Sequence, residues 1–218
     1  MSNLLFLDLE TTGFDTQKAE IIEIAFKTDK LYSKLFKPTE PIPYDVSGIT
    51  NIDNFMVKDC AIFNKLSIPM PIESPNYTII CHNADYDLEI LKRYGLEFKN
   101  YICTYRLAWW FYPTLPNHKL GTLRAFFEIP PLSHLHRATA DTELLEKIFN
   151  KILKDKDIRI EEAIEVTQIA DKEFYSIWNF GKHKGEKIHE SQNSYIRWAL
   201  SNINDLHPKF KSNLEKYV

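Results

Sequence analysis

The chain has 218 residues, 44% apolar and 26% charged, which is the composition of a globular protein able to bury a core. No apolar run approaches the roughly 18 residues that a membrane span needs, and no basic segment leads into an apolar one at the start, so neither a membrane protein nor a secreted one is expected. The net charge of −3 divides unevenly: residues 1–171 hold 19 Lys and Arg against 25 Asp and Glu, and residues 172–218 hold 8 against 5. The basic balance of the second part is compatible with a polyanionic partner.

Periodicity and turn residues predict the elements in chain order. Apolar or alternating segments predict strands at residues 3–9, 20–28, 31–37, 77–81 and 101–104. The proline-rich segments 38–53 and 69–75 are expected to be loops. Helical spacing predicts helices near residues 54–66, 84–94, 104–111, 119–127, 138–153, 194–202 and 208–217. Strands that then alternate with helices indicate an α/β layered domain.

The chain is expected to have three parts. The predicted α/β elements occupy a body over residues 1–155. A lysine- and acid-rich connecting helix or linker covers residues 156–173, and a small C-terminal segment covers residues 174–218. The three cysteines, Cys60, Cys81 and Cys103, lack metal-site spacing, so buried thiols in a reducing compartment such as the cytoplasm are expected.

Two carboxylates stand at the end of the first predicted strand, in the stretch LLFLDLETTGF. Asp8 and Glu10 are two residues apart, so a strand directs both to one face, about 6.8 Å apart along the chain. Carboxylates are seldom buried unless they are paired or bound to a metal. On this pattern alone, a salt-bridged pair at a strand edge is the simpler explanation.

Two further acids change that balance. Asp87 falls in the first turn of a predicted helix, and Asp141 falls in the first turn of another, five residues after His136. Acids favour helix N-termini in any protein. Four acids at the ends of core elements nevertheless form a coherent set of oxygen ligands for two divalent cations about 3.5–4 Å apart. Such ligands favour magnesium or manganese over zinc.

Three motifs in this order resemble those of the DEDDh 3′–5′ exonucleases. They are Asp8-Leu9-Glu10-Thr11-Thr12-Gly13, His82-Asn83-Ala84-x-x-Asp87 and His136-x-Ala138-x-x-Asp141. The resemblance covers residues 3–153 and includes PIPYDVSGITN at 41–51, where Ser47 replaces a histidine that is usual in the family. It implies an α/β, RNase H-like exonuclease fold, with a central mixed sheet flanked by helices and a small C-terminal extension.

The resemblance also implies the chemistry: two Mg²⁺ ions (or Mn²⁺) and hydrolysis of DNA 3′ ends, single-stranded and duplex, to 5′-mononucleotides. Asp8 is expected to bridge the metals, Glu10 and Asp141 to complete the metal nearer the water, and Asp87 to hold the second. His136 has an ordinary pKa of about 6.5, which suits a general base near neutral pH. The expected substrate contacts are Thr11, Thr12, Gly13, Phe14 and Asn83.

The C-terminal stretches FGKHKG (180–185) and YIRW (195–198) resemble the small C-terminal segment of the exodeoxyribonuclease X branch of this family. Lys182, His183 and Lys184 are expected to contact duplex DNA. A solvated turn, with Trp198 packing the tail, explains the same residues without DNA.

Two other functions use the same motifs. A DEDDh exoribonuclease trims RNA 3′ ends with the same residues. A nucleic-acid-binding or polymerase-associated subunit with vestigial chemistry is the other alternative, and the intact DEDDh set argues against it. The sequence does not distinguish a monomer from a homodimer.

Overall fold

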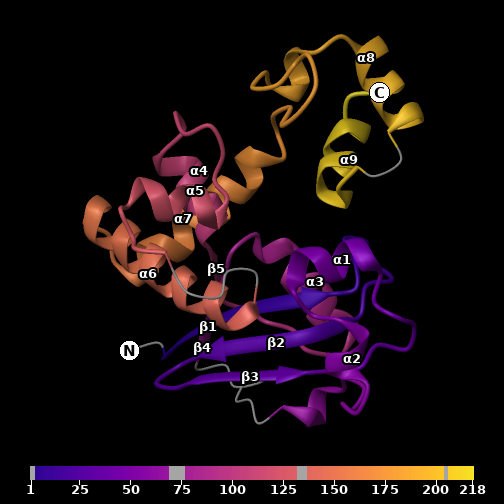
Figure 1. The fold of residues 1–218 in the computed structure, drawn as a ribbon. Coiled ribbons are helices and arrows are strands. Elements are labelled where there is room, and N and C mark those ends of the chain that lie inside the picture. Colours follow the sequence, from indigo (N-terminus) through magenta and orange to yellow (C-terminus); the bar gives the residue numbers. More distant parts are fainter. Residues whose placement is uncertain (1–2, 69–76, 132–136, 204–205) are drawn as a thin grey trace. The chain divides into compact units, whose positions relative to one another are not determined.

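The computed structural model describes residues 3–68, 77–131, 137–203 and 206–218. The chain forms two compact units, Met1–Ile164 and Glu165–Val218, and each is described by itself (Figure 1). Within the described ranges, no helix combines the length and the apolar character that crossing a membrane requires.

The first unit is built on a five-stranded mixed sheet with the strand order β3-β2-β1-β4-β5 (Figure 1). The strands are β1 (Asn3–Thr11), β2 (Ile21–Lys27), β3 (Leu31–Leu35), β4 (Tyr77–Cys81) and β5 (Tyr101–Cys103). The central strand, β1, pairs antiparallel with β2 and parallel with β4. The predicted fold class is confirmed, because a mixed sheet flanked by helices is what the motifs implied.

Helices that are far apart in the sequence pack on this sheet. α3 (Ala84–Arg93) packs against β4 and β5, and α6 (Ala138–Lys156) packs against β1 and β2. The other helices of this unit are α1 (Tyr44–Thr50), α2 (Asn54–Val57), the 3₁₀ helix η1 (Lys65–Ser67), α4 (Thr104–Phe111) and α5 (Leu120–Phe126).

The alternation of β1 divides its side chains between two cores. Leu5, Leu7 and Leu9 join the buried cluster that includes Ile90 and Leu91 of α3. Phe6 points the other way, and its ring packs edge-on against Phe149 of α6, with centroids 5.8 Å apart. Even-numbered residues of β1 therefore face α6.

Two local predictions are wrong. The segment expected to be a loop contains α1, which starts after Pro43 at φ −59° and ends at its C-cap, Asn51, whose N–H donates to the Ser47 carbonyl at 3.0 Å. Proline suits the start of a helix, so it marked a beginning here rather than an interruption. The helix expected over 54–66 ends at Val57, because Val57 and Phe63 are the buried apolar side chains of this stretch and six residues do not share a helix face.

The three cysteines are free thiols. Cys81 and Cys103 are buried as predicted, at the ends of two neighbouring strands. Cys60 is only half-buried, which corrects the prediction for that residue.

The second unit has its own core. Its elements are α7 (Ile160–Phe174), which begins before the boundary of the units, η2 (Ile188–Glu190), α8 (Asn193–Asn202) and α9 (Pro208–Glu215). Trp178 is fully buried among Ile188, Ile196 and Phe210, and its indole N–H donates to Ser191 Oγ at 2.6 Å. The unit is held by a small aromatic core.

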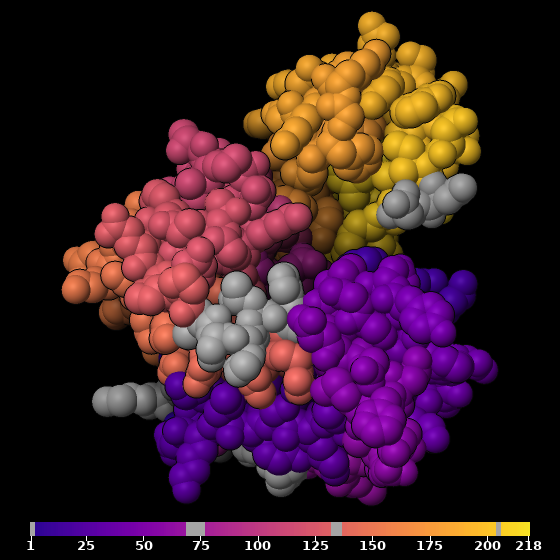
Figure 2. Space-filling view, viewed as in Figure 1, coloured from indigo at the N-terminus to yellow at the C-terminus, as the bar shows by residue number. Residues whose placement is uncertain are grey.

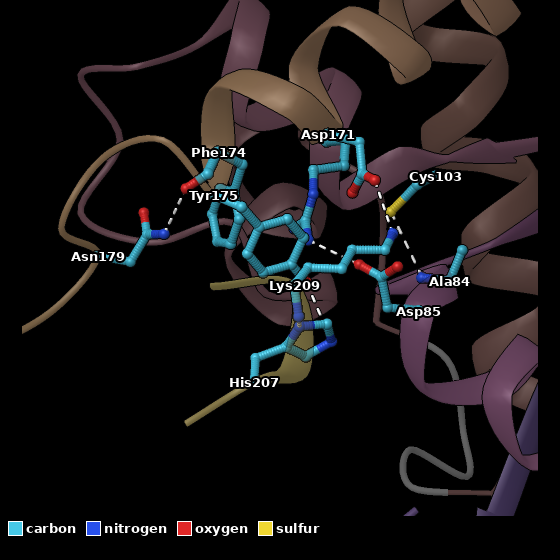
Figure 3. Close-up of polar contacts among 10 residues, drawn as sticks. Ala84, Asp85, Cys103, Asp171, Phe174, Tyr175, Asn179, His207 and Lys209 are labelled. Carbon is cyan, nitrogen blue, oxygen red and sulfur yellow. Dashed lines mark hydrogen bonds and ion pairs between the residues drawn. The ribbon is translucent and has the colours of Figure 1, made fainter. Parts of the chain in front are cut away.

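Polar contacts tie α7 to α9 within the second unit (Figure 3). Lys209 Nζ lies 2.7 Å from the Asp171 carboxylate, and the Tyr175 ring stacks on His207 with centroids 4.6 Å apart. The Asn179 amide donates to the carbonyl at the end of α7 at 2.6 Å.

Candidate active site

An acid cluster lies at the carboxyl end of β1. Asp8 and Glu10 of this strand meet Asp141 in the first turn of α6, with one carboxylate oxygen of each within 4.8 Å of the others. The arrangement follows from the alternation of side chains along β1. Asp8 and Glu10 lie on the same face of the strand as Phe6, and that face packs against α6. Residues more than 130 positions apart are thus brought to one point.

The cluster holds like charges close together in a partly desolvated place. Burial raises the pKa of Asp8 well above its ordinary value, and the charges of Asp87, Glu10 and Asp141 add to the effect. Burial also raises the pKa of Glu10 to about 8, with Asp141 contributing next. A divalent cation would offset both costs, and carboxylate oxygens are the donors that Mg²⁺ and Mn²⁺ prefer. The residues present fit the implied metals.

The fourth predicted acid, Asp87, lies in the first turn of α3 and is 4% exposed. Burial raises its pKa to about 8. The start of α3 is fixed by neighbouring contacts, drawn in Figure 3: the Ala84 N–H donates to Cys103 Sγ at 3.4 Å, and Asp85 accepts from Arg106 at 2.8 Å. These contacts hold the helix turn that carries Asp87.

The predicted general base, His136, lies outside the described residues. The third motif is described from Arg137, the N-cap of α6. The Arg137 carbonyl accepts a hydrogen bond from the Asp141 N–H at 3.1 Å. The backbone of Asp141 is therefore anchored at the residue that follows the histidine.

A pocket of about 220 Å³ opens beside Glu10. It is lined by Leu9, Glu10, Thr11, Gly13, Phe14, Val46, Ile49, Thr50, Asn83 and Tyr86. Of the predicted substrate contacts, Thr11, Gly13, Phe14 and Asn83 line the pocket, whereas Thr12 does not. Thr12 Oγ1 instead accepts a hydrogen bond from the Glu20 N–H at 2.9 Å.

Sequence reasoning missed part of this pocket. Val46, Ile49 and Thr50 come from α1, and this segment lies on the surface of the first unit (Figure 2). Their spacing of three and four residues is helical, and it would have revealed a common face had the prolines not been read as a loop signal. Tyr86 contributes through its hydroxyl, which donates to the Gly13 carbonyl.

Phe14 stands at the mouth of the pocket with 83% of its surface exposed. The Phe14 ring therefore does not anchor its loop in the core. A large aromatic ring kept in solvent beside a pocket is available to stack on a planar ligand.

The predicted basic turn, residues 181–185, is bounded by glycines with φ of +70° and +91°. His183 Nδ1 lies 2.6 Å from the Glu186 carboxylate, and Lys182 Nζ lies 5.1 Å from the centre of the Tyr195 ring. Two of the three predicted DNA contacts thus have partners within the unit.

Trp198 is 49% exposed and stacks on Tyr195, with ring centroids 5.4 Å apart. Trp178, rather than Trp198, fills the core of the second unit. Lys182, Tyr195 and Trp198 together form a basic and aromatic surface.

The mixed sheet and the acids at the end of its central strand define the RNase H-like class of nucleases, which act through divalent metals. The profile of the RNase_T family, described as Exonuclease, matches residues 5–149, and the chain belongs to this family. Its three motifs are of the DEDDh form.

Relatives support this placement at two scales. The chain is 33% identical over 175 residues to DNA polymerase III PolC-type of Caldanaerobacter subterraneus subsp. tengcongensis, covering 74% of the chain but only 12% of the polymerase. It is 25% identical over 224 residues to exodeoxyribonuclease 10 of Escherichia coli (strain K12), covering 99% of the chain and 98% of that enzyme.

A solved structure, exonuclease X in complex with 5′ overhanging duplex DNA, is 26% identical with a TM-score of 0.63. The match covers 75% of this chain and 99% of that one. The recognition of the family from three motifs is confirmed.

Proposed function

We propose that the protein is a 3′–5′ exodeoxyribonuclease that hydrolyses single-stranded and duplex DNA from 3′ ends to 5′-mononucleotides. The observation that carries the proposal is the meeting of Asp8, Glu10 and Asp141 within 4.8 Å beside a pocket of about 220 Å³. The full-length likeness to exodeoxyribonuclease 10 supports DNA as the substrate.

Asp8, Glu10 and Asp141 would hold one divalent cation, and Asp87 with Asp8 would hold a second, Mg²⁺ or Mn²⁺ in each case. Bound there, such ions neutralise charge on the scissile phosphate and lower the pKa of water. The four carboxylates would hold these cations beside the end of β1.

His136 takes the proton of the attacking water, a role inferred from its place in the third motif. The pocket receives the terminal nucleoside. Phe14 stacks on its base, a contact of about 1–3 kcal/mol that every base can make. Thr11, Gly13 and Asn83 bind the sugar and phosphate. Hydrolysis therefore does not depend on the base sequence of the DNA.

The domains follow from this assignment: an exonuclease domain over residues 1–155, a connecting helix over 156–173 and a C-terminal segment over 174–218. Lys182 and Lys184 of that segment contact the phosphates of duplex DNA. Free thiols at Cys60, Cys81 and Cys103 support a cytoplasmic location.

The experiment is degradation of 3′-labelled single-stranded DNA, 5′ overhanging duplex DNA and RNA, each with Mg²⁺ and with EDTA. We expect mononucleotide release from both DNA substrates, dependent on Mg²⁺ and slower on RNA. Asp8→Asn is the control for contaminating nucleases.

Faster release from RNA than from either DNA would replace this proposal with an exoribonuclease. Binding of all three substrates without cleavage would favour the vestigial subunit.

A further inference from the structure

Glu23 is a buried charge that no motif explains. It lies in the middle of β2 with 0% of its surface exposed. In the β1–β2 ladder it stands directly opposite Glu10 of the acid cluster. A buried carboxylate is costly unless it is fully paired, so its partners indicate why it is there.

Four hydrogen bonds satisfy this carboxylate. Arg137 donates through its guanidinium to both oxygens, from Nε at 2.9 Å and from NH2 at 3.0 Å, which is the bidentate geometry of a strong pair. Ser33 Oγ of β3 donates at 2.7 Å, and the Ala138 N–H donates at 3.3 Å. The last contact satisfies a first-turn amide of α6.

The same contacts lead to Asp141. Arg137 is the N-cap of α6, and its carbonyl accepts from the Asp141 N–H at 3.1 Å. Glu23 therefore binds the Arg137 side chain and the N–H of the next residue, Ala138. Arg137 in turn anchors the backbone of Asp141. Glu23 is also the ladder partner of Glu10, so it links the start of α6 to the strand that carries Glu10.

We propose that the Glu23–Arg137 pair is a positioning device: it fixes Asp141 of α6 at the distance from Glu10 of β1 at which the acid cluster binds divalent cations. The inference rests on the proposed function, because it assigns these acids as metal ligands. In this proposal Glu23 and Arg137 are positioning residues, because they act through the backbone that carries Asp141.

A second ion pair joins β2 to α6 and offers a comparison. Lys27 of β2 meets Glu146 of α6 at 2.6 Å, with side chains 25% and 27% exposed. That pair lies further along the helix, away from the cluster. In the Glu23–Arg137 pair the Glu23 side chain is fully buried, whereas the Arg137 side chain is 28% exposed. Ion pairs that bury a charge are often no more stabilising than apolar residues, so a buried carboxylate paired beside the cluster is better explained by geometry.

The test measures Mn²⁺ binding by calorimetry and steady-state kinetics on DNA, using the full chain. Arg137→Lys keeps the positive charge and removes the bidentate guanidinium contact. Glu23→Gln keeps the shape of the side chain and removes its negative charge. Residues that orient metal ligands typically contribute 10–100-fold to metal affinity. We expect each variant to lose about tenfold in Mn²⁺ affinity and to lower kcat, with KM for DNA within about twofold.

Glu146→Gln is the matched control, since it breaks an ion pair between the same two elements. It should leave Mn²⁺ affinity within about twofold of the wild type, a change well below the typical loss. Melting temperatures of all variants in EDTA report the purely structural effect.

Wild-type Mn²⁺ affinity in Arg137→Lys would overturn the inference, and so would an equal loss in Glu146→Gln. Arg137→Lys decides the matter even if Glu23→Gln does not fold. The proposed function fails by a different result, namely normal hydrolysis by Asp8→Asn, so the two failures are distinguishable.

Discussion

The acid cluster of the first unit and the basic turn of the second unit balance their charges in opposite ways. In the cluster, burial and neighbouring carboxylates raise the pKa of Asp8 and Glu10. In the turn, His183 faces Glu186 and Lys182 lies over Tyr195. The turn is stabilised by its own unit, whereas the cluster becomes favourable when a cation binds. A bound cation thus explains the acid cluster, whereas the basic turn is stable without a ligand and is only compatible with one.

Removing one cluster carboxylate should give the largest effect. Asp8→Asn or Asp141→Asn should lower kcat by about 10³-fold or more, because metal-bound charge stabilisation contributes several kcal/mol. The fold should survive, and relief of repulsion should raise the melting temperature in EDTA by about 2–4 °C per kcal/mol relieved. Turnover assays and calorimetry check both outcomes, and near-normal turnover in either variant would remove the two-metal proposal.

Removing the proposed general base should give the next largest effect. His136→Ala should lose about 10²–10⁴-fold in rate, as removal of a general base does, while Mn²⁺ affinity stays close to that of the wild type. In the wild type, activity should rise with pH around the ordinary histidine pKa of about 6.5. A variant that no longer binds Mn²⁺ would instead identify His136 as a ligand.

The pH dependence of metal-free stability sharpens the contrast between the regions. Burial raises the pKa of Asp87 and Glu10 to about 8 from ordinary values of 3.8 and 4.5. Between these limits the folded protein binds more protons than the unfolded chain, so the free energy of unfolding falls as pH rises from about 4 to about 8. In the proposed function Mg²⁺ binds the ionised acids, so it should raise the melting temperature more at pH 8 than at pH 5.

Melting curves in EDTA and in Mg²⁺ across this range make the measurement. Asp87→Asn is the control, and its melting temperature in EDTA should depend less on pH. A melting temperature that depends on pH equally in both proteins would show that Asp87 is not the group responsible.

The basic turn should give the smallest effect. Lys182→Ala with Lys184→Ala should weaken duplex digestion more than single-strand digestion, because a duplex presents a second strand to be held. The slope of log affinity against log salt should become shallower by about one to two units, since each phosphate contact contributes about 0.9. Equal losses on both substrates, or none, would make the turn a structural element only.

Regular elements were predictable because their signals are local. All five strands begin and end within two residues of their predicted bounds, and the acids at the ends of β1, in α3 and in α6 were found from motif spacing. Each signal lies within about ten residues of sequence, where alternation and helical spacing dominate.

Tertiary partners were not predictable in the same way. Nothing near Glu23 in the sequence indicates that Arg137, more than 100 residues later, makes its burial possible. The helical nature of α1 was missed because Pro43 carries the same local signal at a helix start as in a loop. These features depend on which surfaces meet after folding.

The central position of β1 has a consequence for the order of assembly. β1 can pair with β2 early, because they are neighbours in the chain, but its other edge pairs with β4. Its acids meet Asp141 of α6, and the charge of Asp87 in α3 raises the pKa of Asp8. Contacts between distant segments form late, since the loops between them must close first. We therefore expect the proposed metal ligands, which come from three such segments, to meet only after the folding transition state. Mg²⁺ should therefore slow unfolding and leave the refolding rate unchanged, which stopped-flow experiments in Mg²⁺ and in EDTA can separate. By this route the metal would extend the lifetime of the folded chain without guiding its formation.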